Sequence, residues 1–425
     1  MIFAQTTLAT CASMPATALI WCCMPFQIAA EVAAQQARPC PVCLSSTAQA
    51  LHHNHLVPIA GIDLSYRVAR CTQCGFHFAD RLPPAAVYRA YYDGLSKYDL
   101  LQPASALEQQ RAAAALRLCQ RRALNPQARI VDLGCGSGGF LATLRQAGWT
   151  QLTGLDPAPN SSAAAQALYG LDCVRVGTLQ AAPHLIDLQQ ADLLCLLAVL
   201  EHLPDLALDL PSLFGHLKPG CHVLIEVPAL ELFSAKRGEP YGELSLEHIQ
   251  FFSAISLSNL LGRLGLQILE IEHLALPQLD SGSLFVWAQV PPTPVGAAHQ
   301  LPEREPSAVF DAYLQGSAAR MQLALGKVPQ QPFVLYGAGS HSARLVAHMN
   351  PAQQNRLLAV FDANPNLAGK PWGRWQVQAP AALSEHPSVP ILLSSYQSER
   401  AMASALAKAF SNPLVPLYTP ADELI

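Results

Sequence analysis

The sequence predicts an α/β protein organised around a Rossmann-like sheet, and three observations carry this prediction. Apolar strand-like runs alternate with helical patterns from about residue 128 to 229, the spacing of a parallel sheet built from βαβ units. Two further strand-like runs, 266–274 and 282–290, are separated by a turn too short for a crossover helix. A second strand–turn–helix series begins near residue 333. We therefore expect a parallel sheet that ends in an antiparallel hairpin, followed by a smaller Rossmann-like domain.

Length and composition bound the organisation of the chain. Its 425 residues exceed one ordinary core, and 51% hydrophobic with 13% charged residues is typical of a well-packed globular protein. Five regions are expected: a disordered leader (1–36), a cysteine-bearing module (37–100), a sheet domain (101–290), a proline-rich linker (291–303) and a C-terminal Rossmann-like domain (304–425).

The charge balance and the leader limit the partners and the compartment. A net charge of −4 offers no basic surface for a polyanion, so a nucleic-acid partner is not expected. No apolar run is long enough to span a bilayer, so a membrane partner is not expected either. The first 30 residues carry no charge and contain "ALIWCCM" with no basic residue before it, which leaves a signal peptide, a disordered leader, or a start at Met14 or Met24 open. The scattered cysteines favour a cytoplasmic protein.

Two C-x-x-C pairs lie in the second region (37–100), Cys40 with Cys43 and Cys71 with Cys74, and 27 residues separate the pairs. Each pair directs two thiolates to one point, and four thiolates make a closed tetrahedral site typical of structural Zn²⁺. Histidines nearby are competing ligands in principle: His52, His53, His55 and His77. A redox-active or fortuitous pair is the alternative. We expect the zinc to brace a module that has too little core to fold alone.

The elements of the central region follow in order. A helix rich in Ala, Leu and Arg is expected over 104–123, and five strands should form the parallel part of the sheet: 128–136, 151–159, 171–177, 191–202 and 221–229. A helix over 256–265 then leads into the hairpin strands. Beyond the linker, apolar residues at helical spacing predict a helix over 305–326.

The turn after the first central strand is a candidate cofactor site. Gly134, Gly136 and Gly139 spell G-x-G-x-x-G, which lets a backbone approach a ligand at the start of a helix. Asp132 precedes these glycines on the strand, where a carboxylate would repel the pyrophosphate of NAD but favour the ammonium and sulfonium of S-adenosylmethionine (SAM). Asp156 ends the next strand, and its two oxygens match the vicinal hydroxyls of a ribose. The loop therefore favours SAM over NAD.

Several motifs together resemble one family. They are the two cysteine pairs, "AYYDGLSKYD" at 90–99, "AVLEHLPD", "SLEHIQFFS" and "LYGAGS". With these motifs the chain resembles the sugar C-methyltransferases, class I SAM-dependent methyltransferases that have an N-terminal zinc module and a C-terminal Rossmann-like domain. The resemblance covers about 38–420. It implies methyl transfer to a carbon of a nucleotide-linked keto-deoxysugar in bacteria.

The resemblance also implies roles for the loop residues. In class I methyltransferases the stretch "DLGCGSG" cradles the methionine part of SAM, which assigns Asp132, Gly134, Gly136 and Gly138 to that role. The acid of the second strand, here Asp156, holds the ribose.

Carbon methylation requires removal of a proton next to a carbonyl group, and a neutral histidine suits this task. By resemblance His248 is the base, Glu247 orients it, and His202 lines the pocket. Tyr92, or its neighbour Tyr91, occupies the place of the family's pocket tyrosine. The chain departs from the family's Y-H-E-H pattern, since "LSLEH" has no tyrosine two residues before the glutamate. One expected donor to the enolate oxygen is therefore missing.

In the last region Gly337 and Gly339 follow a strand and Asp362 ends the next one, which predicts a nucleotide-binding turn. A plain turn role for Asp362 in "DANPN" is the alternative.

The partner we expect is a small-molecule substrate, in particular a nucleotide sugar. Three rival interpretations stay open: an N- or O-methyltransferase of another small molecule, an RNA methyltransferase with a zinc module, and a non-catalytic protein that senses SAM or a nucleotide.

Overall fold

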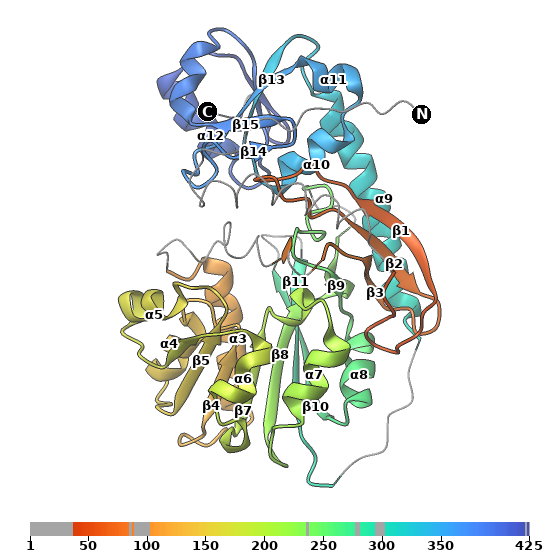
Figure 1. Cartoon of the computed structure of the whole chain (residues 1–425), viewed down its shortest axis with the longest axis vertical. Coiled ribbons are helices and arrows are strands. Elements are labelled where there is room, and N and C mark those ends of the chain that lie inside the picture. The colour runs from red at the N-terminus through yellow and green to blue at the C-terminus, as the bar shows by residue number, and fades with distance from the viewer. Residues whose placement is uncertain are drawn as a thin grey trace, which may run out of the picture.

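A computed structural model describes residues 37–84, 87–88, 103–234, 238–276, 281–293, 302–420 and 423–424. Strands in this part of the chain form three sheets of four, seven and six strands. In Figure 1 the seven-stranded sheet lies below, the six-stranded sheet lies above, and β1–β3 run beside the long helix α9. The predicted leader falls outside the described residues. None of the helices that the structure describes is both long and apolar enough to cross a bilayer.

The seven-stranded sheet has the strand order β10-β11-β8-β7-β4-β5-β6. Its strands are β4 (Ile130–Leu133), β5 (Leu152–Asp156), β6 (Val174–Val176), β7 (Leu193–Leu197), β8 (His222–Pro228), β10 (Gln267–Leu276) and β11 (Ser281–Gln289). The pairs among β4 to β8 are parallel, whereas β11 is antiparallel to both β8 and β10. The predicted fold class, a parallel sheet with an antiparallel hairpin at its edge, is confirmed.

Helices cover both faces of this sheet, because strands buried on both sides need an apolar layer on each. One face packs against α7 and α8, and the other packs against α3, α4 and α5. The bounds of these helices are α3 (Ala106–Arg121), α4 (Gly139–Gln146), α5 (Ser161–Tyr169), α7 (Leu206–Phe214) and α8 (Ala254–Arg263). Alternate residues of one strand point to opposite layers: Val131 joins the first core and Ile130 the second.

The N-terminal sheet has the order β1-β2-β3-β9, and all of its pairs are antiparallel. Three of its strands come from the cysteine-bearing region, namely β1 (Ala48–Asn54), β2 (Tyr66–Cys71) and β3 (His77–Arg81). The fourth, β9 (Gln250–Phe251), comes from the central region and lies directly before α8. The sequence did not predict this strand, because two residues are too short for any periodicity to show.

The C-terminal sheet has the order β14-β15-β13-β12-β16-β17. Its strands are β12 (Phe333–Tyr336), β13 (Leu357–Phe361), β14 (Pro371–Trp372), β15 (Trp375–Gln378), β16 (Ile391–Leu393) and β17 (Leu414–Pro416). Its helices are α10 (Ser340–His348), α11 (Pro351–Arg356) and α12 (Glu399–Ala409), and α9 (Arg304–Gly326) precedes them. One core cluster joins this sheet to α9 and to β2 and β3, so the N- and C-terminal regions are packed together.

Candidate functional site

The glycine loop lies between β4 and α4, at the carboxyl end of the sheet. Gly134, Gly136 and Gly138 have φ values of 77°, 53° and 83°, a left-handed backbone that a side chain would strain. A Cβ on Gly134 would also lie 2.5 Å from a methyl carbon of Val199. The backbone N–H of Gly134 donates to the Leu155 carbonyl oxygen (2.7 Å), which ties the loop to β5. The loop is thus held open by its glycines and fixed to the neighbouring strand.

Two carboxylates, those of Asp132 and Asp156, lie next to this loop. Asp132 is buried, and its Oδ1 has no hydrogen-bond partner among the described residues. Burial, helped by the charge of Asp156, raises the pKa of Asp132 to about 7. Asp156 accepts hydrogen bonds from the N–H groups of Gly136 (2.8 Å) and Ala158 (2.9 Å), and burial still raises its pKa. Asp132 is therefore a buried acceptor that lacks a donor, whereas Asp156 already braces the loop.

These residues fit SAM. The unpartnered Oδ1 of Asp132 needs a donor or cation, which the ammonium group of SAM supplies. Asp156 holds the loop in the open shape and has further acceptor capacity for ribose hydroxyls. When bound, SAM supplies a methyl group on a positively charged sulfur.

A cluster of histidines and carboxylates follows β7 at the same end of the sheet. The rings of His202 and His248 meet edge to face, with centroids 4.9 Å apart. His202 Nδ1 lies 3.2 Å from the Glu247 carbonyl oxygen and 3.7 Å from its carboxylate, while Nε2 lies 3.7 Å from Glu201. One ligand atom from each of Glu201, His202 and His248 lies within 4.8 Å of the other two. The structure thus brings together His202, Glu247 and His248, which are three of the predicted catalytic residues.

The carboxylate of Glu247 lies beside His202, 3.7 Å from its Nδ1. The orientation of His248 by Glu247 stays a prediction. Ser245, which occupies the position before "LEH", accepts hydrogen bonds from the N–H groups of His248 (3.0 Å) and Glu247 (3.3 Å). It closes the turn that carries both residues. Tyr91 and Tyr92 lie outside the described residues.

Buried charges next to this cluster escaped the sequence prediction. Glu201 and Glu226 are almost fully buried, and Arg111 from α3 lies 3.2 Å from the Glu226 carboxylate. Burial, followed by the charge of Glu226, raises the pKa of Glu201 to about 8. Burial lowers the pKa of Arg111, but the surrounding carboxylates outweigh it and the pKa is raised. The only sequence signal for this group is the presence of acids at the ends of two apolar strands.

The four predicted metal-ligand cysteines also come together. The Sγ atoms of Cys40 and Cys74 are 3.7 Å apart, those of Cys43 and Cys71 are 3.5 Å apart, and all four lie within 4.8 Å of one another. Zinc–sulfur bonds of about 2.3 Å in a tetrahedron place the sulfurs roughly 3.8 Å apart. No disulfide joins these four residues. The cluster therefore fits a tetrahedral zinc ion.

The turn after β12 repeats the geometry of the glycine loop. Asp362 accepts from the N–H groups of Ala338 (2.7 Å) and Asn364 (2.7 Å), as Asp156 accepts from the loop and from the residue two positions later. Gly337 has a φ of 110°, and a Cβ there would lie 2.7 Å from the Ser394 carbonyl oxygen. Asp362 thus has the turn role that was one of the two alternatives. Nucleotide contact stays a prediction.

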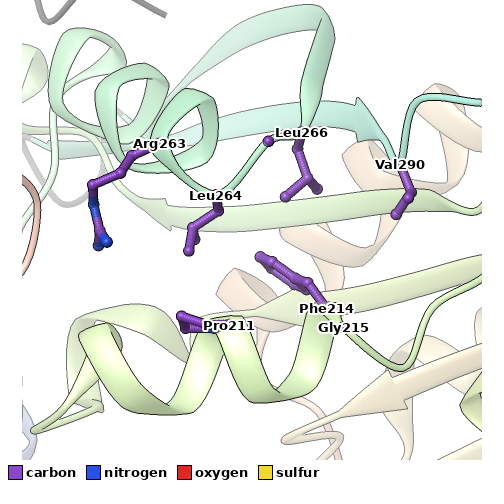
Figure 2. A pocket seen from close by; sticks show the side chains of 8 residues that line it. Pro211, Phe214, Gly215, Arg263, Leu264, Leu266 and Val290 are labelled. Carbon is purple, nitrogen blue, oxygen red and sulfur yellow. The ribbon is translucent and has the colours of Figure 1, made fainter. Parts of the chain in front are cut away.

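A pocket elsewhere on the central region contains none of these residues. It lies where α7 and α8 end, and Figure 2 shows Phe214, Leu264 and Leu266 converging on it, with Arg263 at one edge. Apart from Arg263 its side chains are apolar, and it offers neither a base nor an unpaired carboxylate.

Comparison with known proteins agrees with this geometry. Residues 107–271 match the model of a methyltransferase domain family. The trans-aconitate 2-methyltransferase of Azoarcus sp. (strain BH72) is 35% identical over 122 residues, which cover 28% of this chain and 46% of that enzyme. The chain thus spans slightly less than half the length of this relative. The central region is a class I SAM-dependent methyltransferase domain.

Two solved structures match parts of the chain. A SAM-dependent methyltransferase from Mesorhizobium loti is 22% identical, with a TM-score of 0.34, and the match covers 42% of this chain and 99% of that one. The magnesium protoporphyrin IX methyltransferase of Synechocystis PCC 6803, solved with bound SAM, is 14% identical, with a TM-score of 0.36. That match covers 48% of this chain and 95% of the other.

Proposed function

We propose that this protein transfers the methyl group of SAM to a carbon atom of a nucleotide-linked keto-deoxysugar. The observation that carries the proposal is the meeting of His202 and His248 at the carboxyl end of the methyltransferase sheet, with ring centroids 4.9 Å apart. Two imidazoles beside the cofactor loop supply a base and a hydrogen-bond donor in one place.

In the proposed reaction His248 takes the proton from the carbon next to the substrate's carbonyl group. The electron pair of the broken C–H bond forms an enolate, whose carbon attacks the methyl group while the S–CH₃ bond breaks. S-adenosylhomocysteine leaves, and the proton on His248 passes to solvent. Because His202 Nδ1 approaches the Glu247 carbonyl oxygen, its Nδ1 carries hydrogen in the neutral tautomer. When the ring of His202 is protonated, its Nε2 would donate to the enolate oxygen in place of the missing tyrosine.

The charge of the cluster supports a neutral or cationic acceptor. Among the described residues, Glu226 and Glu201 lie near the guanidinium of Arg111, and the Glu247 carboxylate lies beside His202. A tricarboxylate such as trans-aconitate would meet repulsion here. A sugar ring carries no negative charge, and its nucleotide phosphates would lie away from the cluster. We propose that the turn at Gly337 and Asp362 contributes to holding the nucleotide.

The location of the transferred methyl group tests this proposal. The full chain is incubated with SAM labelled with ¹³C in its methyl group and a panel of nucleotide-linked keto-deoxysugars. The product's ¹³C signal should couple to a ring carbon and lie in the range of carbon-bound methyl groups. A signal of an oxygen- or nitrogen-bound methyl group would overturn carbon methylation but keep methyl transfer. Absence of transfer with every acceptor, together with tight SAM binding, would favour a sensor.

Metal-assisted O-methylation is a second candidate, and one observation favours it. Two histidines and a carboxylate with donor atoms within 4.8 Å of one another are also a set that a divalent cation can use. Bound Mn²⁺ would then be detected by electron paramagnetic resonance in the wild type and lost in Glu201→Gln. The base mechanism predicts no Mn²⁺ signal at this cluster and no stimulation of turnover by Mn²⁺.

A further inference from the structure

The segment that carries His248 is held by the zinc module at three separate points. We call residues 244–263 the His248 segment; it comprises the turn at Ser245, strand β9 and helix α8. The three contacts come from β2, from β3 and from the turn between Cys40 and Cys43. The module therefore contacts the catalytic region at the start, the middle and the end of one segment.

The first contact is the hydroxyl of Tyr66 on β2. This side chain is almost fully buried, and its Oη lies 3.0 Å from the carbonyl oxygens of both Ser245 and His248. The phenol has one hydrogen to donate, and it is shared between the two carbonyl groups. Because these carbonyls flank Glu247 and His248, the contact fixes the backbone from which both side chains project.

The second contact is strand pairing. β9 extends the module's sheet, with His77 opposite Phe251 and Phe78 opposite Gln250. The N–H of Ala79 also donates to the Ile249 carbonyl oxygen (2.8 Å). Backbone hydrogen bonds set the register of the segment directly after His248, so a shift of β3 would move the histidine with it.

The third contact reaches the metal-ligand turn itself. Arg263, at the end of α8, donates to the carbonyl oxygens of Pro41 (2.9 Å) and Val42 (2.8 Å), which lie between Cys40 and Cys43. Burial lowers the pKa of this arginine, and the two cysteines oppose that shift. The side chain of Val42 is buried in the same core as α8. A zinc ion that orders this turn would therefore also fix α8.

We propose that the zinc module positions His248, with Tyr66 as the positioning residue, so that zinc occupancy governs proton removal and not SAM binding. This inference rests on the proposed function, since His248 acts there as the base. The cofactor residues Asp132 and Asp156 lie on β4 and β5, strands that are not part of the His248 segment. The two activities of the site thus depend on different parts of the fold.

Tyr66→Phe tests the proposal in the full-length, zinc-loaded protein, because it removes one hydroxyl and keeps the ring. Tyr241→Phe is the matched control, since Tyr241 is a buried tyrosine whose ring stacks on His52, outside the His248 segment. We expect Tyr66→Phe to lower kcat by about tenfold, the scale of one buried hydrogen bond. KM, affinity for S-adenosylhomocysteine and zinc content should stay near wild type in both variants. An unchanged kcat in Tyr66→Phe would overturn the proposal.

A spectroscopic measurement separates this inference from the proposed function. In protein with ¹⁵N-labelled histidine, the ring signals of His248 are identified by their loss in His248→Asn. They should shift in Tyr66→Phe and keep their wild-type positions in Tyr241→Phe. Unchanged His248 signals in Tyr66→Phe would overturn the positioning role, whether or not any keto-sugar is a substrate. Failure of every keto-sugar with a shifted signal would overturn the proposed function alone.

The role of zinc is tested by comparing Cys71→Ser with Cys173→Ser. Cys173 is a half-buried cysteine outside the cluster. Cys71→Ser should broaden or shift the His248 signals and lower turnover, while S-adenosylhomocysteine still binds. Cys173→Ser should leave the signals and turnover at wild-type values. If Cys71→Ser lost both S-adenosylhomocysteine binding and the His248 signals, the claim that zinc affects proton removal without affecting cofactor binding would be contradicted.

Discussion

The rings of His202 and His248 meet edge to face with centroids 4.9 Å apart, although one follows β7 and the other precedes β9. The N–H of Ile249 donates to the Glu201 carbonyl oxygen (2.9 Å), so backbone as well as side chains joins the two segments. Residues that share one network do not act independently when they are substituted.

We therefore expect the effects of His202→Asn and His248→Asn on turnover to be non-additive. His248→Asn should lower kcat by roughly 100-fold, the usual scale for loss of a general base. His202→Asn should cost less, since it removes a donor and not the base. The double variant should lie close to His248→Asn alone, as measured by steady-state kinetics. Multiplication of the two single effects would show that the histidines work separately.

The second prediction concerns the metal. Purified protein should contain about one zinc ion per chain, held by Cys40, Cys43, Cys71 and Cys74 in an all-sulfur shell. Elemental analysis and X-ray absorption spectroscopy measure the content and the ligand type. Folded protein that lacks zinc, with all four cysteines open to alkylation, would contradict the assignment.

The third prediction is a pH dependence of cofactor binding. The pKa of Asp132 is raised to about 7, while the ammonium of S-adenosylhomocysteine favours the ionised carboxylate. Affinity should therefore increase by about tenfold between pH 6 and pH 8, as the carboxyl group loses its proton. Calorimetry should find a flat profile and weaker binding in Asp132→Asn. NAD should not bind, and tight NAD binding at this loop would refute the cofactor assignment.

The fourth prediction links Glu201 to stability. Its pKa rises from 4.5 to about 8 on folding, so the folded protein retains a proton that the unfolded chain releases. The stabilisation is complete below about pH 4.5 and is lost as the pH rises through 8. The free energy of unfolding of Glu201→Gln, relative to that of the wild type, should therefore increase by roughly 2–3 kcal/mol between pH 6 and pH 9. Denaturant unfolding measures this difference. The exposed control Glu305→Gln should show no such trend, and parallel curves for Glu201→Gln would contradict the shift.

The sequence predicted those parts of the fold whose signals are local. Strands such as β7 and β8 are continuous apolar runs, and the hairpin follows from a turn too short for a helix. The spacing of Cys40, Cys43, Cys71 and Cys74 indicates two C-x-x-C pairs without any knowledge of the fold. The joining of β9 to the cysteine-bearing region could not be predicted, because the pairing of His77 with Phe251 depends on how distant segments pack. For the same reason the ion pair of Arg111 with Glu226 and the contact of Tyr66 with His248 left no pattern in the sequence.

Exchange of a substrate proton tests the central claim most directly. The wild-type protein is incubated in D₂O with a nucleotide-linked keto-deoxysugar and S-adenosylhomocysteine in place of SAM, so that proton removal can proceed without methyl transfer. The account predicts that the proton next to the carbonyl group exchanges for deuterium in the wild type and not in His248→Asn, while both bind S-adenosylhomocysteine equally well. Exchange at the wild-type rate in His248→Asn would contradict it.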